Sequence, residues 1–175
     1  MKTLVLGLGN DLFGDDGVGL EVVKRLRKEL LNDMDSSDSI ATPMGQVDFV
    51  ASTCTGLAIL DFILGYDRLF IIDTIKQPNP QTGRIRVLKE NDLRAVPGPS
   101  PHYLSFNQVL EIGRAADLPV PQELTIIAVE AKDIYHLGEA LSPEMKASLP
   151  AIVKYIKSIL GLETNSDESQ RNQRS

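Results

Sequence analysis

Acidic residues occur where two of the apolar runs in this sequence end. Asp16 lies in the glycine-rich segment 7–19, which follows the first apolar run, and Asp73 directly follows the uniformly apolar residues 69–72. In a doubly wound sheet, ligands bind beyond the carboxyl ends of the strands. If the two strands are neighbours, about 4.8 Å apart, Asp16 and Asp73 face one crevice. Because burying an unpaired carboxylate costs several kcal/mol, packing alone does not explain Asp73.

Both positions also have an ordinary structural explanation. Acidic side chains are stabilised near the positive end of a helix dipole, so Asp15 and Asp16 can be simple capping residues. Asp73 can be an N-cap or a turn acceptor. A dinucleotide-binding loop is excluded, because Leu12 stands at the third glycine position of that motif and two carboxylates would repel a pyrophosphate.

His102 adds a nitrogen donor to this set. It follows Pro101 in a proline-rich loop that enters a helix, for which Ser100 is the expected N-cap. A helix N-terminus disfavours the imidazolium form, so the ring stays neutral and able to bind a metal. The alternative is an ordinary surface histidine. Asp16, Asp73 and His102 together predict an open metal site with three protein ligands.

Other nucleophilic arrangements have less support. Cys54 could act as a nucleophile with His102 as its base, but a small cysteine before a helix is more often a packing residue. His136 lies beside Tyr135 and Leu137 and is interpreted as structural. The sequence contains no G-x-S-x-G and no H-E-x-x-H, so serine-hydrolase and zincin chemistry are unsupported.

Strand and helix patterns alternate along the chain. This alternation predicts an α/β fold with three layers, in which helices cover both faces of a twisted, mostly parallel sheet. Expected strands are 2–8, 46–51, 69–72, 85–87 and 124–129, and expected helices are 18–30, 56–64, 103–116 and 143–160. Ser142 and Pro143 mark the start of the last helix, as N-cap and first residue.

Composition limits the classes of protein to which the chain can belong. The 175 residues carry 18 Lys and Arg against 24 Asp and Glu, a net charge of −6, so nucleic acid is not an expected partner. A single cysteine fits a reducing cytoplasm. We find no signal peptide and no apolar stretch of the roughly 20 residues that span a bilayer. We therefore expect a soluble cytoplasmic protein with one domain, residues 1–160, and a disordered tail, residues 161–175.

The motifs above occur in the order and spacing found in the maturation endopeptidases of nickel-iron hydrogenases. The chain resembles this family from residue 1 to about residue 160. The matching segments are Gly7-Leu8-Gly9-Asn10 through Asp15-Asp16-Gly17-Val18-Gly19, Ile71-Ile72-Asp73-Thr74-Ile75, Ser100-Pro101-His102 and Leu141-Ser142-Pro143-Glu144. The resemblance implies a five-stranded twisted sheet and three nickel-contacting residues, which fall on Asp16, Asp73 and His102.

The resemblance also implies an activity. Members of the family cut a C-terminal extension from the hydrogenase large-subunit precursor after nickel has been inserted, and the substrate's nickel is the recognition element. We thus expect a monomeric endopeptidase whose partner is the nickel-loaded precursor. Whether a nickel-bound water or a carboxylate general base breaks the peptide bond stays open. The loop 51–56 departs from the acidic-Gly-Gly-Thr segment of the family, so its substrate contacts are not carried over.

Two other functions fit part of the pattern. A phosphoacceptor receiver module has an acidic pair, a later aspartate and a lysine around magnesium, here Asp15 and Asp16, Asp73 and Lys132. However, Asp133 stands where such modules carry proline, and 175 residues is long for one. A non-catalytic nickel chaperone would bind the metal but leave every precursor uncut.

The tail provides the first prediction. Deleting residues 163–175 leaves folding and precursor cleavage unchanged, because this segment has no apolar face that could pack on the domain. The measurements are the melting temperature and the cleavage rate of the truncated protein. Lost activity at an unchanged melting temperature would show that the tail contacts substrate.

Overall fold

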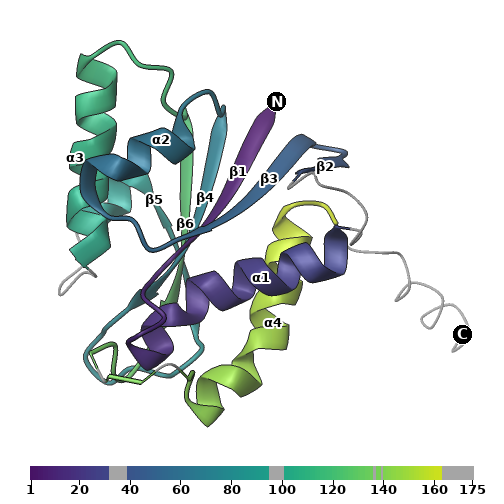
Figure 1. Ribbon diagram of the computed structural model, residues 1–175, viewed down its shortest axis with the longest axis vertical. Coiled ribbons are helices and arrows are strands. Elements are labelled where there is room, and N and C mark those ends of the chain that lie inside the picture. The colour runs from purple at the N-terminus through teal and green to yellow at the C-terminus, as the bar shows by residue number, and fades with distance from the viewer. Residues whose placement is uncertain (32–38, 95–100, 136, 139, 163–175) are drawn as a thin grey trace, which may run out of the picture.

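A six-stranded sheet with strand order β2-β3-β1-β4-β6-β5 forms the centre of the computed structural model (Figure 1). The structure describes residues 1–31, 39–94, 101–135, 137–138 and 140–162, with the backbone alone for 93, 94 and 101–105. The strands are β1 (Lys2–Leu8), β2 (Ser39–Thr42), β3 (Gly45–Ser52), β4 (Arg68–Ile75), β5 (Ile85–Lys89) and β6 (Glu123–Glu130). Strands β3, β1, β4 and β6 run parallel, while β2 and β5 pair antiparallel at the two edges.

Helices cover both faces of this sheet. They are α1 (Val18–Leu30), α2 (Leu60–Ile63), α3 (Pro101–Ala115) and α4 (Pro143–Ile159), with short 3₁₀ helices at Gly14–Gly17, Gly56–Ile59 and Glu90–Arg94. Helices α1 and α4 lie on one face, and α2 and α3 on the other (Figure 1). The three-layer α/β/α fold with a mostly parallel sheet is confirmed.

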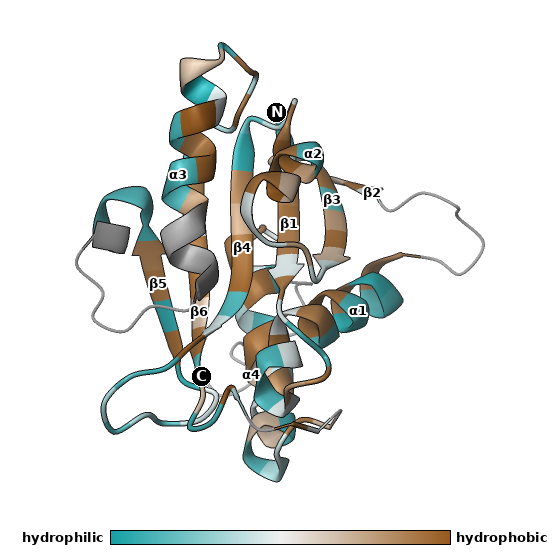
Figure 2. Ribbon diagram, turned by 60° about the vertical axis from the view of Figure 1, so that its left-hand side comes forward, coloured by the Kyte–Doolittle hydropathy of each residue, from teal (hydrophilic) through white to brown (hydrophobic). Residues whose placement is uncertain are grey.

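Alternate strand residues supply two separate apolar cores. Phe70 and Ile72 of β4 face the core under α1 and α4, whereas Leu69 and Ile71 face the core under α3. Strands buried on both faces are apolar at nearly every position, as the hydropathy colouring of β1 and β4 shows (Figure 2). Among the described residues, no helix is long and apolar enough to cross a membrane.

The structure differs from the predicted elements in four places. The expected helix 56–64 is a 3₁₀ helix over Gly56–Ile59 that continues as the short α2. The sheet has a sixth strand, β2, because residues 39–42 fold back on β3 through a turn in which Gly45 adopts a φ of 111°. Strand β4 does not end at Asp73, because Thr74 and Ile75 remain buried and pair with β6. Helix α3 begins at Pro101, so His102 belongs to its first turn rather than to the preceding loop. The expected N-cap Ser100 lies outside the described residues.

Glycines allow α1 to press against the carboxyl ends of β1 and β4. A Cβ atom on Gly19 would lie 2.2 Å from the carbonyl oxygen of Leu8 and 2.4 Å from that of Ile72. One on Gly7 would lie 2.2 Å from the carbonyl oxygen of Gly19. Real side chains do not tolerate such distances to backbone. The helix start, and Asp16 just before it, can therefore lie directly against the strand ends.

Glu130, the last residue of β6, holds the connection between β4 and β5. Its buried carboxylate accepts hydrogen bonds from the backbone N–H of Gln81 at 2.9 Å and from Nε of Arg86 at 2.5 Å. Burial raises the pKa of Glu130, but the hydrogen bonds and the charges of Arg86 and Arg84 outweigh burial and hold this pKa below its ordinary value.

This arrangement predicts a pH-dependent contribution to stability. A lowered pKa in the folded state stabilises the protein above the pKa of the unfolded state, and this contribution is lost as pH falls through the folded pKa. Glu130→Gln should lower the free energy of unfolding by about 1–3 kcal/mol near neutral pH. It should also lose less stability than wild type on acidification to about pH 3, which lies well below the ordinary pKa of a glutamate. Urea unfolding at both pH values measures the difference, and equal losses in the two proteins would contradict this role.

Candidate functional site

Asp16 and Asp73, the two carboxylates of the predicted metal site, lie near the ends of neighbouring strands. Strands β1 and β4 are adjacent and parallel, with Gly7 opposite Ile72, as the crevice argument required. Asp73 is the next residue of β4, and Asp16 lies in the 3₁₀ helix Gly14–Gly17 between β1 and α1. Asp16 is 7% exposed and Asp73 is fully buried. Both acids therefore lie inside the protein rather than on an open surface.

Protein donors hold both oxygens of Asp16. Its Oδ2 accepts the backbone N–H of Asn10 at 3.1 Å, and its Oδ1 accepts the hydroxyl of Thr74 at 2.7 Å. The first bond closes the loop after β1 on itself, and the second ties this loop to β4. Asp16 is thus fixed against the strand that carries Asp73.

Thr74 also contacts Asp73. Its backbone N–H lies 2.7 Å from Oδ1 of Asp73 and donates to it. One residue of β4 therefore donates to both carboxylates. Sequence reasoning did not single out Thr74, because a buried threonine in a strand is an ordinary β-branched residue and nothing in the pattern reveals its polar partner.

The structure describes only two of the three side chains of the predicted metal site. The backbone places His102 at the start of α3, but its side chain lies outside the described set, so its approach to Asp16 and Asp73 stays a prediction. Within the described residues, no group of three or more His, Cys, Asp or Glu side chains could hold a metal ion. Asp16 and Asp73 offer hard oxygen ligands, but two carboxylates alone leave a divalent ion short of donors.

Asp15 has a structural role. Its carboxylate accepts hydrogen bonds from the backbone N–H and the hydroxyl of Ser142, at 2.7 and 2.8 Å. Ser142 in turn accepts the N–H of Met145 at 3.2 Å, which confirms it as the N-cap of α4. The capping explanation of the acidic pair therefore applies to Asp15, although the helix concerned is α4 and not the adjacent α1.

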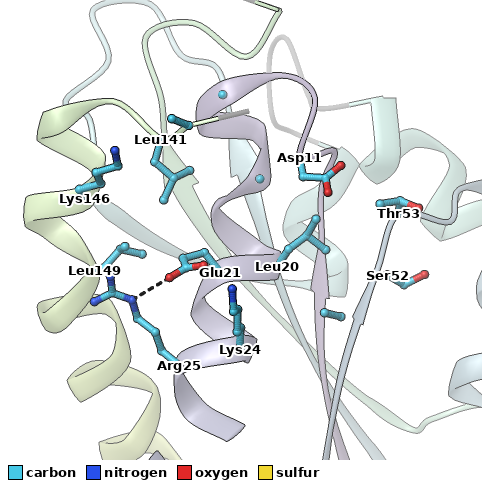
Figure 3. Close-up of a pocket in the computed structure, with 14 residues that line it drawn as sticks. Asp11, Leu20, Glu21, Lys24, Arg25, Ser52, Thr53, Leu141, Lys146 and Leu149 are labelled. Atoms are coloured by element: carbon cyan, nitrogen blue, oxygen red, sulfur yellow. Dashed lines mark hydrogen bonds and ion pairs between the residues drawn. The ribbon is translucent and has the colours of Figure 1, made fainter. Parts of the chain in front are cut away.

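A groove of about 790 Å³ lies over the outer side of α1, between α4 and the end of β3 (Figure 3). Apolar side chains from α1 and α4 and the region before α4 line it, among them Leu20, Leu141 and Leu149. Charged side chains flank them, and one pair, Arg25 and Glu21, is joined at 3.1 Å. The groove reaches the 3₁₀ helix that carries Asp16, but neither Asp16 nor Asp73 lines it.

Cys54 follows the strand end that borders this groove. It is half-buried, and its backbone N–H donates to the hydroxyl of Ser52 at 3.1 Å. This bond shapes the loop and involves no sulfur chemistry. A pairing of Cys54 with His102 is untested, because the His102 side chain is not described.

Comparisons with known proteins agree on one family. The family model described as hydrogenase maturation protease matches residues 21–159, a span that includes Asp73 and His102. The hydrogenase 2 maturation protease of Escherichia coli K12 is 26% identical over 164 residues, covering 91% of each chain. The hydrogenase expression/formation protein HupD of Rhizobium leguminosarum bv. viciae is 27% identical, over 87% of this chain and 71% of that protein.

Solved structures show the same fold. The E. coli hydrogenase maturating endopeptidase HybD superposes with a TM-score of 0.71 at 24% identity, over 91% of this chain and 92% of that one. The [NiFe] hydrogenase maturation protease HybD of Thermococcus kodakarensis gives 0.66 at 26% identity, over 91% and 99%. Because the family model spans most of the chain, the receiver-module alternative is set aside. The chain belongs to the hydrogenase maturation protease family and is an endopeptidase.

Proposed function

We propose that this protein removes the C-terminal extension of a nickel-iron hydrogenase large-subunit precursor after nickel insertion. In this proposal Asp16, Asp73 and His102 recognise the nickel that the substrate carries. Family membership supports the type of reaction. The observation that carries the proposed site is that Asp16 and Asp73, from separate segments, are both held by Thr74 at the carboxyl edge of β1 and β4.

The donor set suits transient recognition better than storage of an ion. Two carboxylates and one imidazole are fewer and harder ligands than the thiolates of a hydrogenase site, and soft sulfur ligands hold nickel more firmly. The precursor therefore keeps its ion while the enzyme adds ligands to it. This contact brings the neighbouring peptide bond to the carboxylates and supplies proximity only when nickel is present.

Two ways of activating the attacking water fit these residues. A carboxylate can take the proton as general base, or the substrate's ion can lower the pKa of a bound water. Asp16 accepts hydrogen bonds from Asn10 and Thr74, which restrict its rotation in either case. We expect the enzyme to act as a cytoplasmic monomer. A nickel chaperone without catalysis would leave the precursor intact, so cleavage itself distinguishes the two functions.

Nickel on the substrate should gate the reaction. The enzyme should cut nickel-loaded precursor and leave apo-precursor intact, because without the ion nothing aligns the peptide bond with Asp16 and Asp73. The experiment treats apo, nickel-loaded and zinc-loaded precursor with the same enzyme and follows the loss of the extension by mass measurement of both products. Equal cutting of the apo and nickel forms would rule out gating and leave a sequence-directed protease.

Two substitutions distinguish the proposed role of His102 from a nucleophilic role of Cys54. His102→Ala should lower kcat/KM for nickel-loaded precursor by about 100-fold or more, because a recognition ligand is lost. The melting temperature should change little, since a polar residue at a helix start contributes little to the core. Cys54→Ala serves as the matched control and should keep most of the activity. The opposite pattern, an inactive Cys54→Ala protein with an active His102→Ala protein, would favour a Cys-His nucleophile.

A further inference from the structure

We infer that Thr74 is a positioning residue, whose hydroxyl sets the orientation of Asp16 and whose backbone N–H sets that of Asp73. The inference rests on the proposed function, because the two carboxylates matter only if they meet the substrate's nickel. Thr74 itself would touch neither the ion nor the peptide. Its role is to present two acids in a fixed arrangement.

The geometry of Thr74 leaves little freedom. The residue is fully buried and pairs with Val129 of β6, so its backbone is fixed in the centre of the sheet. From this position Oγ1 lies 2.7 Å from Oδ1 of Asp16, and the backbone N lies 2.7 Å from Oδ1 of Asp73. A rigid strand residue therefore transmits its position to both acids.

The hydrogen bonds leave Asp16 able to accept a further partner. Each carboxylate oxygen has two lone pairs, and protein donors use one on each oxygen, from Asn10 and from Thr74. These two hydrogen bonds fix the orientation of the Asp16 carboxylate, and with it the directions of its remaining lone pairs. A ligand that is oriented in advance does not lose rotational freedom when the ion arrives, which is why donors behind metal ligands affect metal affinity.

A buried threonine in this sheet does not need a hydrogen bond for its hydroxyl. Thr3 of β1 is an equally buried threonine in the same sheet, and its Oγ1 has no hydrogen-bond partner among the described residues. A strand residue of this size is therefore accommodated whether or not its hydroxyl is bonded. What distinguishes Thr74 from Thr3 is the carboxylate that its hydroxyl meets.

The test compares substitutions at these two threonines. Thr74→Val removes the hydroxyl and keeps the shape, and it should lower kcat/KM for nickel-loaded precursor by about 10–100-fold. The affinity of the free enzyme for Ni²⁺ alone, measured by calorimetric titration, should fall by a similar factor. Thr74→Ser keeps the hydroxyl and should restore most of both values. Thr3→Val makes the same chemical change elsewhere in the sheet and should leave both unchanged.

Thermal unfolding checks that each variant is folded. If Thr74→Val does not fold, Thr74→Ala removes the hydroxyl without adding a methyl group and takes its place. Wild-type values in the folded hydroxyl-free variant would overturn the inference, and so would an equal loss in Thr74→Ser, which would indicate packing. If wild type binds Ni²⁺ but cuts no precursor, the proposed function fails while the affinity series still decides the role of Thr74. If wild type neither cuts precursor nor binds Ni²⁺, both fail.

Discussion

The close packing of the start of α1 on the ends of β1 and β4 is the constraint on which the site depends. It requires Gly7 and Gly19, because a side chain at either position would collide with backbone carbonyl groups. With these glycines in place, the turn before α1 lies directly against β4. Only then can Asp16 reach the hydroxyl of Thr74, 58 residues further along the chain.

Buried acidic side chains fix the loops and a helix start at the same end of the sheet. Asp15 anchors the N-terminus of α4 through Ser142, Asp16 joins the first loop to β4, and Glu130 holds the connection between β4 and β5. Each carboxylate accepts more than one hydrogen bond, which offsets the cost of removing it from water. The apolar layers thus determine the fold, while the acids determine where its loops lie.

In the proposed function, this division of roles lets a rigid fold make a transient contact with the substrate. Asp73 lies within a strand and Asp16 lies against it, so neither depends on a mobile loop for its position. Under the proposed function, nickel held by the precursor would meet two carboxylates that are already oriented. The groove along α1 lies over the surface between α4 and the end of β3, and Gly14 and Gly17 of the turn that carries Asp16 line it (Figure 3).

The sequence by itself determined the layered fold and singled out Asp16 and Asp73 as acids at strand ends. Apolar periodicity reports burial, so it located the parallel strands and long helices, and the Ser142–Pro143 pair located the start of α4. Apolar periodicity does not show which strands pair or which side chains form hydrogen bonds with one another. The short edge strand β2 has no distinctive pattern, and the continuation of β4 through Asp73 follows from its pairing with β6. The partner of Asp15 lies 127 residues away, and the hydroxyl of Thr74 has no local signature, so only the tertiary structure could decide which acid anchors a helix and which bonds to β4.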